Sequence, residues 1–227
     1  MSLIPTVIIL AGLFQAAPAA ASGEVSVSLA EHFPLEENLG WRYNSNLGEV
    51  KSRVVVENEQ LTIDSRSRRL DIVQNFILAP EGVLLTSAES RAFLYSSRRT
   101  YHPHLLRFPA DVSVGRTWEW EGKEVVDRRT IIESRVTGVI EGREKVTVPA
   151  GEFDCLKVTV ETVSDDGTVS SSTQWLAPRV GIVKAEVEIE AGGLSGLLIS
   201  LLGFDTYFLE LLEMTGPDGE VIFPAGK

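Results

Sequence analysis

Apolar and polar residues alternate along most of the chain, and this alternation constrains the fold more than any other feature of the sequence. In residues 156–161 (Leu-Lys-Val-Thr-Val-Glu), and again in residues 182–189, every second side chain is apolar. A period of two places these side chains on one face of a strand and the polar ones on the other. No window of 12 residues between positions 24 and 190 shows the period of a helix. The pattern predicts an all-β, antiparallel fold with one wet face, as a sandwich, a barrel or a curved open sheet.

Turn residues separate the expected strands. Proline fixes φ and glycine permits positive φ, so the runs 149–152, 165–168 and 216–219 each predict a tight connection. The expected strands of the second half are a hairpin over 143–163, then 169–176, 182–189, 207–215 and 220–223. Those of the first half are 50–57, 60–65, 70–79 and, after a turn at 80–82, residues 83–87.

A short motif occurs twice, about 75 residues apart. Each copy has Phe-Pro, then a glycine, then two aromatic residues at positions i and i+2, which share one face of a strand. The copies are Phe33-Pro34, Gly40, Trp41 and Tyr43, and Phe108-Pro109, Gly115, Trp118 and Trp120. The repeat indicates two similar β-units, about 30–100 and 106–223, joined near residues 99–107 within a single domain spanning 22–227.

The first 21 residues resemble a secretory signal. Residues 3–14 are mostly apolar, and a run rich in alanine, residues 16–21, follows with cleavage expected after Ala19 or Ala21. The apolar run is shorter than the roughly 20 residues that a membrane span needs. No cysteine lies near the cleavage site, so lipid attachment there has no thiol to use. We therefore expect a periplasmic or secreted protein with no stable transmembrane span.

The charge balance argues against nucleic acid as a partner. The chain has 21 basic and 32 acidic side chains, a net charge of −11, whereas binding to phosphate backbones or to anionic membranes needs clustered lysine and arginine. The arginines form scattered runs at 66–69, 98–99 and 128–129. We interpret these runs as solvated strand edges, which discourage edge-to-edge pairing. The alternative interpretation is a specific anionic ligand.

Catalytic and metal-binding patterns are weak in this sequence. His102 and His104 place two imidazoles close together, but zinc needs three or four ligands, and only folding could bring Asp111 or His32 to them. No Gly-x-Ser-x-Gly motif or phosphate-binding loop is present. The single cysteine, Cys155, excludes an internal disulfide and fits a small buried residue. We expect no enzyme activity, no metal and no cofactor.

One uncharged segment, residues 191–204, departs from the strand pattern. The leucines in it follow the i, i+3, i+4, i+7 spacing of a short helix, expected over residues 195–202. Such a segment either plugs one end of the β-structure as core, or covers an apolar cavity, or touches lipid. The candidate ligand-binding residues are Leu194, Leu197, Leu198, Leu201, Trp118 and Trp175. For Trp175, a place in the core or at its rim competes with ligand stacking.

Several of these motifs occur together in a family of exported bacterial proteins. The Phe-Pro…Gly…Trp starts, the run 146–153 (Val-Thr-Val-Pro-Ala-Gly-Glu-Phe) and the run 174–184 (Gln-Trp-Leu-Ala-Pro-Arg-Val-Gly-Ile-Val-Lys) resemble the DUF3108 group, over roughly residues 30–215. The resemblance implies an antiparallel sheet wrapped into a half-open β-barrel. It is similar more remotely to periplasmic lipid and lipoprotein carriers such as LolA and LolB. The family offers no catalytic residues to transfer.

Two functions remain open from the sequence. The leading hypothesis is a non-catalytic protein that binds an apolar or amphipathic, lipid-like ligand in the concave face of the sheet, lined by Val, Leu, Ile and Phe. The alternative is an interaction module of the envelope, which docks a partner protein through a sheet edge or through the leucine-rich residues 194–202.

Overall fold

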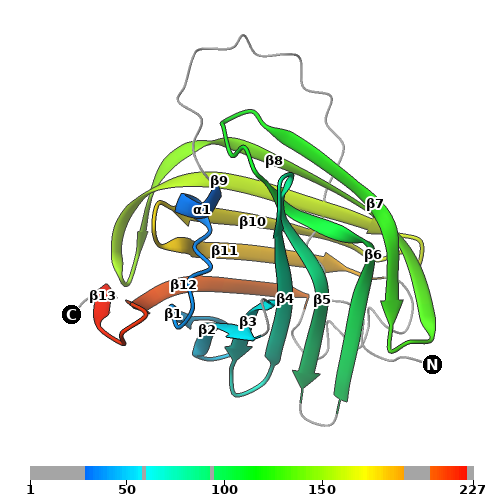
Figure 1. Cartoon of the computed structure of the whole chain (residues 1–227), viewed down its shortest axis with the longest axis horizontal. Helices are drawn as coiled ribbons and strands as arrows, with labels where there is room; N and C mark the ends of the chain where they lie inside the picture. Colours follow the sequence, from blue (N-terminus) through cyan, green and yellow to red (C-terminus); the bar gives the residue numbers. More distant parts are fainter. Residues whose placement is uncertain (1–28, 58–59, 93–94, 192–204, 224–227) are drawn as a thin grey trace.

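The computed structural model describes residues 29–57, 60–92, 95–191 and 205–223 (Figure 1). In these residues the chain forms one short helix, α1 (Leu29–His32), and thirteen strands. The strands are β1 (Gly40–Asn44), β2 (Val50–Glu57), β3 (Gln60–Arg66), β4 (Asp71–Ala79), β5 (Gly82–Ala92), β6 (Tyr95–Pro109), β7 (Thr117–Val126), β8 (Thr130–Val148), β9 (Gly151–Ser164), β10 (Val169–Ala177), β11 (Gly181–Glu190), β12 (Thr206–Thr215) and β13 (Val221–Phe223). None of the helices among the described residues is both long and apolar enough to cross a membrane.

The strands form one antiparallel sheet in which each strand pairs with the next along the chain. The sheet closes because β1 also pairs with β12, residues 40–44 against residues 210–215. Figure 1 shows these two strands side by side, one from each end of the chain. The all-β, antiparallel class predicted from the sequence is confirmed, and the barrel is closed through β1 and β12, whereas the expectation was a half-open one.

The turns predicted from proline and glycine connect strands in the structure. Residues 149–150 join β8 to β9, and Gly167, Gly181 and Gly219 adopt φ values of 81°, 87° and 85°, which other residues rarely adopt. Every strand expected from the alternation is present, although β5 and β8 extend further than predicted. The four-residue helix α1 was not predicted.

The largest of three hydrophobic clusters among the described residues fills the barrel between β4 and β10 and is rich in aromatic rings. Phe33, just after α1, packs against Phe108 with 4.9 Å between ring centroids and against Phe76 with 6.0 Å. The phenylalanines of the two Phe-Pro motifs therefore meet in the core. Trp118 and Trp120 of β7 are buried in the same cluster, as expected for aromatic residues at i and i+2.

The second cluster lies at the closure of the barrel. It joins Trp41 of β1 and Met214 of β12 to the outer end of the β8–β9 hairpin, where Phe153 and Cys155 are buried. Trp41 Nε1 donates a hydrogen bond to Val180 O at 2.7 Å, and this bond ties β1 to the turn before β11.

Two sequence-based expectations need comment at this level. The joint expected near residues 99–107 lies inside β6, a continuous strand of the single sheet, because its residues pair with β5 and β7 as a strand does. The expected helix at 195–202 and the signal segment 1–21 lie outside the described residues.

Candidate functional site

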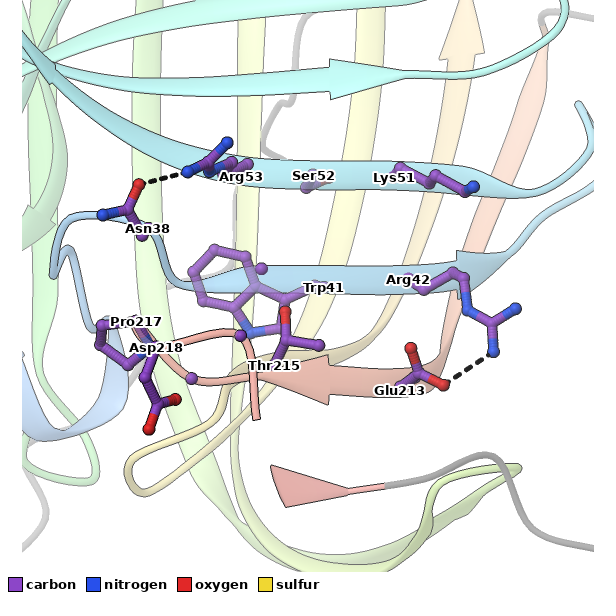
Figure 2. A pocket seen from close by; sticks show the side chains of 13 residues that line it. Asn38, Trp41, Arg42, Lys51, Ser52, Arg53, Glu213, Thr215, Pro217 and Asp218 are labelled. Carbon is purple, nitrogen blue, oxygen red and sulfur yellow. Dashed lines mark hydrogen bonds and ion pairs between the residues drawn. The ribbon is translucent and has the colours of Figure 1, made fainter. Parts of the chain in front are cut away.

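A shallow groove of about 510 Å³ lies on the outer surface over β1, β2 and β12 (Figure 2). Its charged side chains already have partners: Arg42 pairs with Glu213 at 3.0 Å and with Glu49 at 3.4 Å, and Arg53 donates a hydrogen bond to Asn38. Because these pairs are partly or fully exposed to water, they contribute little energy and leave no concentrated charge for a ligand. The groove offers no set of converging groups.

A second cavity, of about 110 Å³, opens into the barrel and has a different chemistry. Residues from β1, β2, β3, β4, β6, β11 and β12 line it, together with the segment that follows α1. Its apolar wall includes Phe33, Phe76, Ile63, Ile182 and Leu209, and its polar groups are Ser52, Ser65, Gln74 and Arg107. A mostly apolar cavity with a few converging polar groups is the usual form of a small-molecule site.

Arg107 is the most unusual residue of this cavity. Its side chain belongs to β6 and is buried, with 8% of the residue exposed. Nη2 donates a hydrogen bond to Gln174 Oε1 at 3.0 Å, and the guanidinium carbon lies 4.8 Å from the centre of the Phe108 ring. No carboxylate of the described residues forms an ion pair with this guanidinium. Burial lowers the pKa of Arg107 to about 10, so the side chain still carries its charge at neutral pH.

The polar groups of β10 continue along the inside of the barrel from Gln174. Gln174 Nε2 donates a hydrogen bond to Ser172 Oγ at 2.8 Å, and both side chains are buried. Ser170, two residues further along the same face, is also buried, and its Oγ has no hydrogen-bond partner among the described residues. The interior is therefore not lined by Val, Leu, Ile and Phe alone, as expected from the sequence; a polar strip runs through it.

A buried ion pair lies near the other end of β6. Arg99 Nη1 and Glu124 Oε2 are 2.5 Å apart, and Glu124 is 1% exposed. Burial raises the pKa of Glu124 above its ordinary value, although Arg99 opposes this shift. The interpretation of the arginine runs as solvated edges is thus wrong for Arg99, because its strand turns this side chain inward while Arg98 stays exposed.

Neither predicted tryptophan lines the interior cavity. Trp118 is buried beside Phe108, with 6.5 Å between ring centroids, and its Nε1 has no hydrogen-bond partner among the described residues. Trp175 is buried in the second cluster, where its Nε1 donates to Glu144 and the Lys184 ammonium lies 4.9 Å from its ring. The four predicted leucines, Leu194, Leu197, Leu198 and Leu201, lie outside the described residues.

The histidines and the cysteine that the sequence analysis considered for metal binding or catalysis do not form such a site among the described residues. His102 and His104 are exposed on β6, and the described residues hold no group of three or more His, Cys, Asp or Glu side chains that could bind a metal. Cys155 is buried, and burial raises the pKa of its thiol to about 12, which keeps it protonated at neutral pH. The expectation of a small buried cysteine is confirmed.

The two runs 146–153 and 174–184, which carried the resemblance in the sequence, form the β8–β9 turn and the β10–β11 connection. Residues 122–196 match the DUF3108-like family. The resemblance is confirmed over that stretch, which runs from β7 through β11 and includes both runs. The Phe-Pro motifs lie before the matched DUF3108-like stretch.

Three solved structures are similar at low identity. A candidate lipoprotein from Parabacteroides distasonis is 15% identical, with 81% of this chain and 98% of the other covered and a TM-score of 0.40. The hypothetical lipoprotein YmcC from Escherichia coli is 13% identical, with 80% and 85% covered and a TM-score of 0.44. A candidate exported protein with a YmcC-like fold from Bacteroides fragilis is 14% identical, with 82% and 99% covered and a TM-score of 0.35. No curated protein matches the sequence.

Proposed function

We propose that this protein is an exported, non-catalytic binding protein that holds an apolar or amphipathic ligand inside its barrel. The interior cavity carries the proposal, because the residues of seven strands that line it are mostly apolar and a few polar groups converge on it. Apolar surface that a ligand buries there is worth about 25 cal/mol per Å².

The size of the cavity indicates how much of a ligand it accepts. At about 110 Å³ it is comparable to the apolar cavity of roughly 150 Å³ that takes up benzene in another protein. The bound part is therefore a headgroup and a few carbons, or a small ring.

The interior chemistry supports binding over catalysis. Arg99 and Glu124 compensate each other's charge, and Cys155 lies in the second cluster with a raised thiol pKa. Arg107 remains protonated and has no neighbouring general base among the described side chains of the cavity wall. At neutral pH the thiol of Cys155 keeps its proton and the guanidinium of Arg107 keeps its charge, whereas nucleophilic and acid–base chemistry need groups that give up and take up protons.

The proposed location is the periplasm or the exterior of the cell. The signal-like residues 1–21 support it. The absence of any disulfide from a chain with one cysteine fits a protein whose packed barrel provides the stability.

The second proposal is a docking module of the envelope. Among the described residues β13 pairs on one edge, with β12, and Val221 and Ile222 on it are 46% and 48% exposed. An exposed apolar edge strand is able to receive a partner strand.

A cavity-filling variant tests the binding function. Ser65→Phe places a ring in the cavity, and Ser171→Phe places the same ring on β10 between two inward-facing serines, hence on its outer face. Both variants and the wild type are purified from their own compartment and compared by native mass spectrometry and organic extraction. We expect an apolar ligand with the wild type and with Ser171→Phe, and its loss from folded Ser65→Phe.

Recovery of wild-type protein without any bound apolar molecule, from cells grown under several conditions, would contradict the binding function. Capture of a partner protein that Ile222→Lys abolishes, in the same preparations, would favour docking through β13 instead.

A further inference from the structure

Arg107 places a positive charge in the barrel, and no carboxylate of the described residues pairs with it. The other interior cation, Arg99, is 2.5 Å from Glu124, whereas Arg107 has a neutral amide as its hydrogen-bond partner at 3.0 Å. Burying an uncompensated charge is costly, and proteins usually offset the cost with an ion pair or a bound counter-ion. In the described part of the chain, the cavity wall therefore has a guanidinium, that of Arg107, and no carboxylate beside it.

The guanidinium is held in position by a chain of hydrogen bonds. Ser172 Oγ accepts from Gln174 Nε2 at 2.8 Å, which turns Gln174 Oε1 toward Arg107 Nη2. The Phe108 ring supports one side of the guanidinium at 4.8 Å. Arginine has five N–H donors in a rigid fork, and Gln174 occupies one of them. The remaining donors are available to an acceptor in the cavity.

Other polar groups lie on the same cavity wall. The Gln74 side chain of β4 has no hydrogen-bond partner among the described residues, and Ser52 and Ser65 share one hydrogen bond at 2.8 Å. The amide of Gln74 is able to donate a hydrogen bond to an oxygen, and so is the one serine hydroxyl that accepts in the Ser52–Ser65 bond. Around them stand the apolar walls described above, which suit a hydrocarbon chain.

We propose that the barrel binds the carboxylate end of an acyl-chain amphiphile, with the Arg107 guanidinium as the partner of the carboxylate and the apolar wall around its first carbons. This inference rests on the proposed binding function and names the ligand class. A carboxylate matches the fork of an arginine with two parallel hydrogen bonds. One guanidinium balances the single charge of a carboxylate, whereas the double charge of a phosphate monoester calls for a second cation, and no other cation lines the cavity in the described part of the chain.

Three ten-carbon probes separate the possibilities: decanoate, decan-1-ol and decyl phosphate. Each is titrated by calorimetry at pH 7 into the folded chain after its ligands have been removed, with the two anions below their micelle concentrations and decan-1-ol below its solubility limit. We expect decanoate to bind more tightly than the other two. Arg107→Gln should weaken decanoate at least about tenfold, the loss expected for a charge-assisted contact, and leave decan-1-ol unchanged.

Two further variants keep the test independent of folding defects. Gln174→Glu supplies a carboxylate next to Arg107 from within the chain, so it should raise the melting temperature, abolish the preference for decanoate and keep decan-1-ol binding. Arg143→Gln removes an equal charge from an exposed position on β8 and should change neither affinity.

The outcomes distinguish the inference from the function beneath it. Equal binding of decanoate and decan-1-ol, unaffected by Arg107→Gln and Gln174→Glu, would overturn the carboxylate site and leave the binding function standing. Tighter binding of decyl phosphate than of decanoate would also overturn the carboxylate assignment. Failure of all three probes to bind the wild type would overturn both.

Discussion

The carboxylate of Glu124 is buried inside the barrel, where it loses its hydrating water and has Arg99 as its ion-pair partner. Its carboxylate lies 2.5 Å from Arg99 and is almost fully buried. Loss of hydration is the largest influence on this group, and it raises the pKa of Glu124 above the ordinary value of 4.5 in spite of the ion pair. A buried pair of this kind adds less stability than its short distance implies.

The raised pKa of Glu124 predicts a pH dependence of stability. A carboxyl whose pKa is higher in the folded state favours folding below its unfolded pKa, and this contribution is lost as the pH rises through the folded pKa. The free energy of unfolding of the wild type should therefore fall relative to that of Glu124→Gln between pH 4.5 and the raised pKa, by about 1.4 kcal/mol for each unit of pKa difference. Urea unfolding of both proteins from pH 4 to pH 7 measures the difference. A wild type that gains on the variant as the pH rises would show that Arg99 dominates.

The charged interior residues are the part of the site that the sequence could not reveal. Arg107 follows His104-Leu105-Leu106, a stretch without alternation, because the β5–β6 pairing shifts register near Leu84 and Leu85. A bulge changes which side chains face inward, and it depends on the partner strand. Gln174 could have been noticed, since Ser170, Ser172 and Gln174 occupy alternate positions of a predicted strand and must share one face.

At the scale of elements, the packing of β7 on β8 depends on a glycine beneath an indole. Trp118 and Gly138 are directly opposite each other in the two strands, and a Cβ atom added at Gly138 would overlap the Trp118 ring. The ring covers the backbone that a side chain would otherwise shield. Gly142, further along the same strand, has open space at the corresponding position.

These two glycines predict opposite responses to alanine. Gly138→Ala forces the Trp118 ring out of its place in the core and should lower the free energy of unfolding by about 1–3 kcal/mol. Gly142→Ala should leave it unchanged or slightly higher, because alanine reduces the conformational freedom of the unfolded chain. Chemical denaturation followed by tryptophan fluorescence compares the two variants. Equal effects at both positions would contradict the close contact between Trp118 and Gly138.

The positions of the strands could be predicted from local sequence patterns, whereas their lengths could be predicted less well. The turn at residues 149–150 and the glycine at 181 act within a few residues, so their chemistry can be read directly. The strand β8 extends back to residue 130, because its pairing with β7 continues through residues whose own pattern is weaker. Pairing partners set strand length, and a single strand's sequence carries little of that information.

At the scale of the molecule, one pairing turns a meander into a ring. All other pairings join strands that are neighbours in sequence, whereas β1 and β12 come from opposite ends of the described chain. Hydrogen bonds from Trp41 Nε1 to Val180 O at 2.7 Å and from Tyr43 OH to Ile182 O at 2.9 Å reinforce the closure. From the sequence a sandwich, a barrel and a curved open sheet all remained possible, because no local feature of β1 indicates that it pairs with a strand so distant along the chain.

Because the ring closes through β1 and β12, a substitution that disrupts the hydrogen bonds of β1 should also destabilise β12. Arg42 lies between Lys51 of β2 and Glu213 of β12, so its strand has partners on both sides. Arg42→Pro removes a backbone donor there and should lower the free energy of unfolding by about 3 kcal/mol or more. Hydrogen exchange by mass spectrometry should show faster exchange in β2 and β12 as well as in β1.

The matched control is Ile222→Pro in β13, which lies outside the ring and, within the described strands, pairs with β12 alone. Its effect should remain within β13 and the facing end of β12, because removing an added edge strand leaves every pairing of the ring intact. If Arg42→Pro accelerates exchange in β1 alone, the two ends of the chain do not stabilise each other and the barrel does not behave as a closed unit. Faster exchange that also reaches β11 would show that the shape of the interior cavity depends on the pairing of β1 with β12. The reason is that β1, β11 and β12 all contribute to the cavity wall.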